Sequence, residues 1–125
     1  MVDANMLDIG RAMASVRSDV VYPGHPSIPD IARDALDDMW IPIAGRLGLV
    51  VLSRDKRLRY KPVERRALVA HAVRVVNLTS SNNLSSWDRL TLITRHWQRI
   101  EMRARTPGPW LLALSQNGLR EASLD

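Results

Sequence analysis

Three mostly apolar segments, rich in Val and Leu, give the expected framework of the chain. They are residues 49–52, 73–79 and 110–114. Apolar runs that do not alternate with polar residues are typical of strands buried on both faces of a parallel sheet. We predict residues 49–52 as the central strand, because this run is the most apolar and ends at a dense group of charged residues. Two shorter strands are expected, one ending at Asp3 and one at 19–23.

Helical spacing of apolar residues separates these strands. The pattern predicts helices at 5–16, 37–47, 62–70 and 86–105, and one or two helical turns at 30–36. Pro42 should kink or restart the helix that contains it, because proline has no N–H to donate. Glu64 lies in the first turn of its helix, where a negative charge suits the helix dipole.

The last predicted helix carries an apolar stripe made of Trp87, Leu90, Ile93, Trp97 and Ile100. We therefore expect Trp87 and Trp97, like Trp110, to lie in the core, whereas Trp40 suits the core or a half-exposed position. Strands that alternate with helices imply right-handed crossovers and an α/β fold with a mainly parallel sheet of about five strands. The whole chain, 1–125, is expected to be one domain, with 115–125 as a polar tail.

Composition and charge indicate which classes of partner suit the protein. The formal charge of +5 and a pI near 10.7 favour a polyanion such as nucleic acid over no specific partner. The chain has no cysteine, which excludes disulfides and thiolate metal sites. No apolar run approaches the ~20 residues of a membrane span, and the start does not resemble a signal peptide. We therefore expect a cytoplasmic protein with no membrane partner.

Four aspartates fall at comparable places in this framework. Asp3 and Asp55 follow the first and central strands, and Asp37 and Asp38 begin the helix that leads into the central strand. If the two strands are neighbours, these carboxylates converge at one edge of the sheet, where sites form in parallel sheets. Converging carboxylates and oxygen ligands suit Mg²⁺ or Mn²⁺. Taken singly, Asp3 and Asp37 are equally typical of helix caps, and Asp55 of a turn residue paired with Arg57.

Basic residues surround Asp55 and suggest a path for nucleic acid. The candidates for RNA binding are Arg54, Lys56, Arg57, Arg59 and Lys61. We select Arg57 and Arg59 for phosphate contacts, while Tyr60 suits either stacking on a base or packing against its own loop. The alternative is an ordinary solvated surface. The three histidines have no metal-ligand spacing.

Taken in order, five segments resemble the PIN-like nucleases, and most closely the compact VapC-type toxins of type II toxin–antitoxin pairs. The segments are 2–7, 37–42, 50–59, 62–65 and 78–85. The resemblance implies a three-layer α/β/α sandwich and a Mg²⁺-dependent endoribonuclease that inhibits growth or translation. It also implies neutralisation by a cognate antitoxin protein and a possible homodimer.

The resemblance also assigns roles to residues. The family's acids map onto Asp3, Asp37 or Asp38, and Asp55, while supporting polar positions map onto Asn5, Thr79 and Ser80. The first strand is shorter than in the family, and no acid lies between Thr79 and Leu84. These two departures keep open an alternative, a PIN-like module that binds RNA or a protein partner without cutting. A nuclease directed at DNA is a third possibility.

Overall fold

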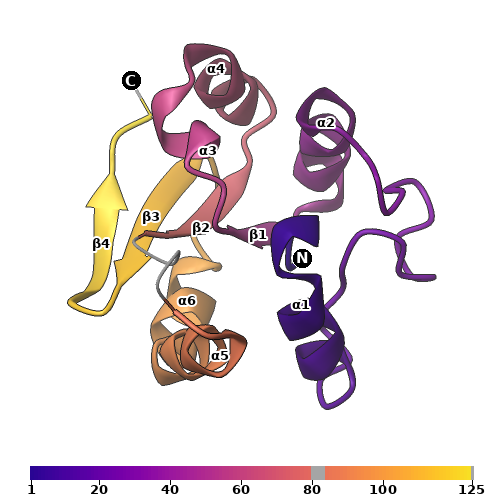
Figure 1. Cartoon of the computed structure of the whole chain (residues 1–125). Helices are drawn as coiled ribbons and strands as arrows, with labels where there is room; N and C mark the ends of the chain where they lie inside the picture. Colours follow the sequence, from indigo (N-terminus) through magenta and orange to yellow (C-terminus); the bar gives the residue numbers. More distant parts are fainter. Residues whose placement is uncertain (80–83, 125) are drawn as a thin grey trace.

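The computed structural model describes residues 1–79 and 84–124 and contains one four-stranded sheet in the order β1-β2-β3-β4 (Figure 1). The strands are β1 (Val50–Ser53), β2 (Arg74–Leu78), β3 (Trp110–Ser115) and β4 (Gly118–Ala122). The β1–β2 and β2–β3 pairs are parallel, and the β3–β4 pair is antiparallel. The prediction of a mainly parallel α/β sheet is confirmed.

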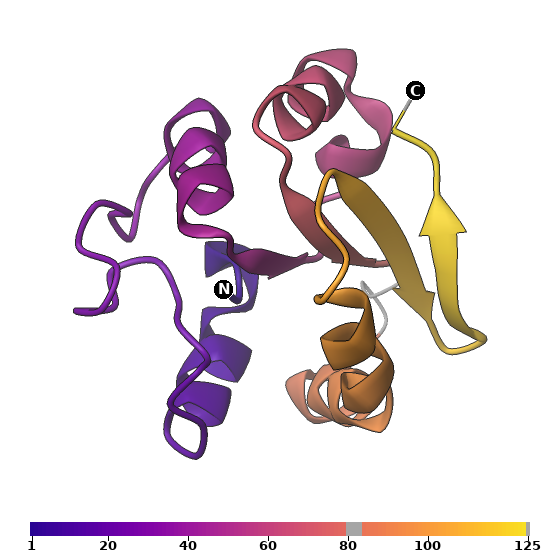
Figure 2. The ribbon, with the colours of Figure 1, turned by 180° about the vertical axis from the view of Figure 1, so that it is seen from behind.

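Helices cover both faces of the sheet and give three layers, as Figures 1 and 2 show. One face carries α1 (Leu7–Ala14), α5 (Ser86–Arg95) and α6 (Trp97–Arg103). The other carries α2 (Asp37–Leu47), α3 (Arg57–Tyr60) and α4 (Pro62–Ala70). A short 3₁₀ helix, η1 (Ala4–Met6), leads into α1. The fold is the three-layer α/β/α arrangement that the sequence suggests.

The alternation of strand side chains divides the core into two halves. Leu52, Val76 and Leu112 face the α1, α5 and α6 side and pack in one cluster with residues such as Ile93. Their neighbours Val51, Val75 and Leu111 face the α2 and α4 side and pack in a second cluster. Because both faces of each central strand are buried, these strands have no polar face, which explains their continuous apolar sequence.

The first strand is reduced to one pair of residues. Val2 forms an isolated parallel bridge with Leu52, and the Asp3 N–H donates to the Leu52 carbonyl at 2.8 Å. This bridge places Asp3 beside β1, as predicted. The predicted strand at 19–23 and the predicted helical turns at 30–36 are wrong, because both segments form turns and irregular structure. Pro23 ends the first segment and has no N–H to donate to a neighbouring strand. The second segment is short, and short helices are marginal without supporting packing.

The expected polar tail is wrong as well, because it contains β4. The turn between β3 and β4 has Gly118 at φ +126°, a conformation that favours glycine, and the Asn117 N–H donates to the Ser115 hydroxyl. Asn117-Gly118 is a strong hairpin signal. The strand after this turn is an exposed edge strand. It was not predicted because its sequence mixes polar and apolar residues. The sheet therefore has four strands and one bridge instead of about five strands.

The predicted helix at 86–105 is broken at His96 into α5 and α6. Trp110 and Trp40 are buried, and Trp97 packs half-buried against the core. Trp87 is 75 % exposed, so its expected place in the core is wrong. Six residues of a helix turn by about 240°, which puts Trp87 well off the face that buries Ile93.

Helix α2 runs through Pro42 without restarting. Proline removes the hydrogen bond to the carbonyl four residues earlier, here the carbonyl of Asp38. Because Asp38 is exposed, this carbonyl is within reach of solvent and the helix continues. Among residues 1–79 and 84–124, no helix is long and apolar enough to cross a membrane.

A close approach of the backbone fixes α2 against the turn after α4. A Cβ at Gly45 would lie 2.2 Å from the His71 carbonyl oxygen. In open space, Gly→Ala inside a helix stabilises by about 1 kcal/mol. We expect Gly45→Ala to destabilise the protein by at least about 2 kcal/mol in urea unfolding, because backbone atoms must separate. Gly10→Ala, whose Cβ would meet only side-chain atoms at 3.2 Å, should cost less, and equal effects would contradict this packing.

Candidate active site

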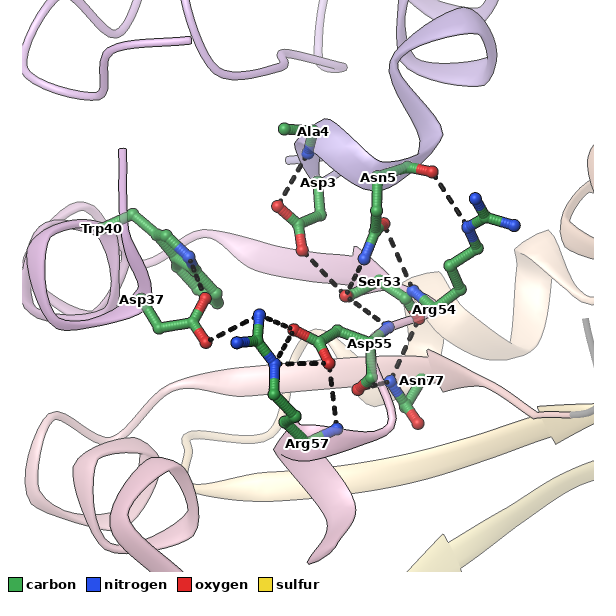
Figure 3. A network of polar contacts seen from close by, with 10 residues as sticks. All are labelled: Asp3, Ala4, Asn5, Asp37, Trp40, Ser53, Arg54, Asp55, Arg57 and Asn77. Atoms are coloured by element: carbon green, nitrogen blue, oxygen red, sulfur yellow. Dashed lines mark hydrogen bonds and ion pairs between the residues drawn. The ribbon is translucent and has the colours of Figure 1, made fainter. Parts of the chain in front are cut away.

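Three of the predicted acids come together at the carboxyl end of β1 (Figure 3). Asp3 follows the Val2 bridge, Asp55 follows β1 by two residues, and Asp37 is the first residue of α2. The charges of Asp37 and Asp55 both act on Asp3, and the charge of Asp55 acts on Asp37. The structure therefore forms one acidic site from three distant parts of the chain.

Ser53, the last residue of β1, joins two of these parts. Its hydroxyl is fully buried and donates to Asp3 Oδ2 at 2.8 Å. The same oxygen accepts from the Asp55 N–H at 3.0 Å and from Asn5 Nδ2 at 3.2 Å. One donor and two acceptors are all that a hydroxyl offers, so Ser53 is saturated and fixes Asp3 relative to the Asp55 turn.

Asn77 supports the same turn from β2. This fully buried side chain donates to the Ser53 carbonyl at 3.2 Å and to the Asp55 carbonyl at 3.0 Å. Its Oδ1 accepts from Arg59 Nε. The predicted supporting residue Asn5 lies in the same network, where its Oδ1 accepts from the Arg54 N–H at 3.4 Å. The side-chain amides of Asn5 and Asn77 and the hydroxyl of Ser53 thus form hydrogen bonds with the backbone groups where β1 ends.

The structure distinguishes between the two aspartates at the start of α2. Asp37 turns toward the site, and its Oδ1 accepts a hydrogen bond from Trp40 Nε1 at 2.9 Å. Asp38 is exposed to solvent. Asp37 is not a helix cap, since Leu36 occupies the N-cap position. Asp37 is therefore the acid of this pair that belongs to the site.

Arg57 lies between Asp55 and Asp37. Its Nε lies 3.1 and 3.0 Å from the two Asp55 oxygens, and its Nη2 lies 2.7 Å from Asp55 Oδ2. The same Nη2 is 3.7 Å from Asp37 Oδ2. The Arg57 N–H also donates to Asp55 Oδ1 at 2.9 Å, which starts α3. Asp55 therefore pairs with Arg57 in the turn after β1, as one interpretation of the sequence predicted, and the same residue is one of the acids of the site. Likewise, Asp3 accepts from the Ala4 N–H as the cap of η1.

The pKa shifts follow from burial and from these partners. Burial raises the pKa of Asp3, and the charges of Asp37 and Asp55 add to this against the Ser53 and Ala4 hydrogen bonds. Burial also raises the pKa of Asp37. Partial burial alone would raise the pKa of Asp55, but the hydrogen bonds from Arg57 outweigh it and the pKa of Asp55 is lowered.

The chemistry of these donors fits a hard divalent cation. Three carboxylates are the oxygen ligands that Mg²⁺ and Mn²⁺ prefer, and their mutual repulsion would be relieved by positive charge. Among residues 1–79 and 84–124, however, no three His, Asp or Glu side chains converge closely enough to hold an ion. In this arrangement Arg57 supplies the positive charge between Asp55 and Asp37.

The other predicted basic residues differ in their surroundings. Arg54 Nε donates to the Asn5 carbonyl at 3.0 Å. Arg59 lies over the Tyr60 ring, with its guanidinium carbon 4.8 Å from the ring centre. Lys56 and Lys61 flank α3 (Arg57–Tyr60) and are exposed to solvent. The interpretation of the run as RNA-binding stays a prediction.

Of the two predicted polar positions after β2, only one is described. The Thr79 hydroxyl donates to the Leu114 carbonyl at 3.4 Å, so its described contact is to β3. Ser80 lies outside the described residues.

A groove of about 410 Å³ opens beside the acids, between α2 and α4. Its apolar lining comes from Ala35, Leu36, Ile41, Val63 and Ala67, and its polar lining from Asp37, Asp38, Arg57 and Glu64. Glu64 acts electrostatically on Asp37 and Arg57. The sequence suggested only a helix-dipole role for Glu64, so this fourth acid was missed.

Two further residues of the site were missed, and one had a visible signal. Asn77 interrupts the apolar strand at 73–79, and a buried polar residue requires partners. Ser53 had no such signal, because serine is common at the end of a strand.

Asp3→Asn should stabilise the protein at neutral pH. Because the pKa of Asp3 is raised, the folded state keeps a proton that the unfolded state has released, and stability falls as the pH rises through that interval. We expect Asp3→Asn to raise the urea midpoint at about pH 7 and to lose this advantage below about pH 3, where the aspartate is neutral in both states.

Asp55→Asn provides the matched comparison with the opposite sign. Because the pKa of Asp55 is lowered, the ionised side chain stabilises the folded state at pH values above its ordinary pKa. This stabilisation is lost as the pH falls through the lowered pKa of the folded state. We expect Asp55→Asn to lower the urea midpoint at about pH 7. Shifts of the same sign in both variants would contradict the described electrostatics.

Comparison with known proteins identifies the family to which the chain belongs. A family model described as a PIN like domain matches residues 1–80, more than half of the 125-residue chain. The matched segment contains Asp3, Asp37, Ser53 and Asp55. No curated protein and no solved structure matches the chain. Members of the matched family are generally nucleases, and the carboxylate cluster suits a module of that type. The chain therefore belongs to the family of PIN-like domains.

Proposed function

We propose that the protein is a Mg²⁺-dependent endoribonuclease. The observation that carries this proposal is the placement of Asp3, Asp37 and Asp55 around the carboxyl end of β1, where Ser53 bonds the Asp3 carboxylate and the Asp55 backbone. The net charge of +5 and the exposed Lys56 and Lys61 near Asp55 in the sequence favour a polyanionic substrate. Membership of the PIN-like family supports phosphodiester hydrolysis.

The proposed roles follow from each residue's surroundings. A bound divalent ion would polarise the phosphodiester and lower the pKa of a water molecule. Asp3 and Asp55 would hold it, because Ser53 fixes the Asp3 carboxylate and the backbone of Asp55. Asp37 would orient the water or hold the ion from α2, with its carboxylate held in place by Trp40. The groove beside Asp37 offers an apolar wall against which a base or ribose of the RNA would pack.

We further propose that the enzyme is a VapC-type toxin that inhibits growth and is neutralised by an antitoxin. The ordered segments shared with that group support this role. A second support is the mainly apolar groove that Met13, Val16, Leu90 and Trp97 line, where Val16 is 81 % exposed. Such a surface suits a protein partner, either the antitoxin or a second copy.

A second candidate function is RNA or protein binding without cleavage. Arg57 favours it, because its guanidinium already neutralises Asp55 and lies close to Asp37. Under this alternative, RNA would bind equally well in EDTA and in Mg²⁺ and would stay intact.

The two neighbouring aspartates of α2 provide a sharp test of the enzyme. Asp37→Asn should lower Mg²⁺-dependent cleavage of single-stranded RNA more than about a hundredfold, because a group that holds or orients the reacting centre is lost. Asp38→Asn, which removes the same charge one residue away at the exposed side of the groove, should lower cleavage far less. Cleavage is measured on labelled oligoribonucleotides with purified protein, and single-stranded DNA of equal sequence tests the alternative substrate.

Two outcomes would contradict the proposal. If the wild type leaves diverse RNAs intact in Mg²⁺ and Mn²⁺, it is not this enzyme. If Asp37→Asn and Asp38→Asn lose activity equally, the assignment of the site is wrong. For the toxin role, expression of the wild type should slow bacterial growth, and Asp55→Asn should relieve the effect.

A further inference from the structure

Among the residues that the structure describes at the site, Arg57 opposes the proposed chemistry. Nη2 of its guanidinium lies 2.7 Å from Asp55 Oδ2 and 3.7 Å from Asp37 Oδ2. These distances place a fixed positive charge between two carboxylates that would otherwise face a cation. The partner acids are largely enclosed, with side chains 14 % and 20 % exposed, whereas the Arg57 side chain is 56 % exposed. The guanidinium thus covers the acids from the solvent side.

The structure allows the side chain of Arg57 to leave without disturbing its backbone. The Arg57 N–H is held by Asp55 Oδ1, and the next residue, Leu58, is fully buried beneath α3. The described side-chain contacts of Arg57 are the ion pairs to Asp55 and Asp37. An exposed arginine held by ion pairs exchanges partners at little cost. A phosphate group offers the same bidentate geometry as a carboxylate.

We propose that Arg57 is a built-in competitor of the divalent ion and that the phosphate backbone of a nucleic acid draws it away, so that the ion and the nucleic acid bind cooperatively. This inference rests on the proposed function. Without nucleic acid, Arg57 neutralises Asp55 and weakens ion binding. With nucleic acid, a phosphate pairs with Arg57. The negative charge of the two carboxylates is then no longer compensated by the guanidinium and attracts the ion more strongly.

The size of the effect follows from the charges. A guanidinium a few ångströms from a divalent ion repels it, and the exposure of Arg57 reduces this repulsion by solvent screening. Removing the guanidinium should therefore tighten ion binding on the order of tenfold. Nucleic acid that captures Arg57 should tighten ion binding by a comparable factor, and by reciprocity the ion should tighten nucleic-acid binding by that same factor.

The indole N–H of Trp40 reports on the site because it donates to Asp37. We would titrate Mg²⁺ into ¹⁵N-labelled protein and follow this indole signal, with and without a short 2′-O-methyl phosphorothioate oligoribonucleotide that resists cleavage. The proteins are the wild type, Arg57→Gln, Arg57→Lys and Lys56→Gln. Lys56→Gln is the matched control, because it removes one positive charge from the adjacent exposed position. Amide spectra of each variant verify the fold.

Arg57→Gln should bind Mg²⁺ about tenfold more tightly than the wild type, and Arg57→Lys and Lys56→Gln should stay closer to the wild type. The oligonucleotide should tighten Mg²⁺ binding in the wild type and in Lys56→Gln, but not in Arg57→Gln. Equal or weaker binding by Arg57→Gln, or coupling that persists in it, would overturn this inference alone. If Mg²⁺ binds to none of the proteins, with or without the oligonucleotide, the proposed metal-dependent function falls too.

Discussion

The buried hydroxyl of Ser53 is the interaction on which the rest of the site depends. It donates to Asp3 and accepts from the backbone of Asp55, so a single oxygen relates two acids that lie 52 residues apart in the chain. The requirement is physical, because a buried carboxylate without donors would carry a large desolvation cost. Asn5 and Asn77 complete the network and leave each of its buried polar groups with a partner.

The sheet makes this network possible. The parallel pairing of the Val2 bridge with β1, and of β1 with β2, brings three chain segments to one edge with their carboxyl ends together. Helix α2 then adds Asp37 from the covering layer, and its close contact with the turn after α4 through Gly45 keeps it in place. The fold thus determines which acids meet. Burial raises the pKa of Asp3 and Asp37, and the hydrogen bonds from Arg57 lower that of Asp55.

Much of this was predictable from local sequence signals, and the failures have identifiable causes. The apolar runs located β1, β2 and β3, and helical spacing located α2 and α4 closely. The edge strand β4 was missed because a solvent-facing strand has a mixed sequence. The break at His96 was missed because no proline or glycine marks it in the sequence. Trp87 was misplaced because the predicted stripe is wider than the buried face of α5, which holds Ile93 but not Trp87. The nearness of Asp3 and Asp55 followed from strand order, but the choice of Asp37 over Asp38 required three-dimensional packing. The pairing of Asp55 with Arg57 was predictable because it is local, whereas Ser53, Glu64 and the contact of Arg57 with Asp37 depend on contacts across the chain, which spacing along a sequence does not encode.

Arg57 compensates the charge of the acidic site in this structure. A cluster of acids is repulsive by itself, and under our proposal the arginine that relieves this repulsion also weakens ion binding, in line with the conflict between stability and function at active sites. Asp3 is buried and held by Ser53, and a pH titration of the Asp3 carboxyl followed by ¹³C NMR is the decisive measurement. We predict a midpoint above the ordinary value of 3.8, raised further in Ser53→Ala and unchanged in Ser15→Ala, which removes only an exposed hydroxyl. A midpoint of Asp3 at or below the ordinary value, or one that Ser53→Ala does not move, would contradict this prediction.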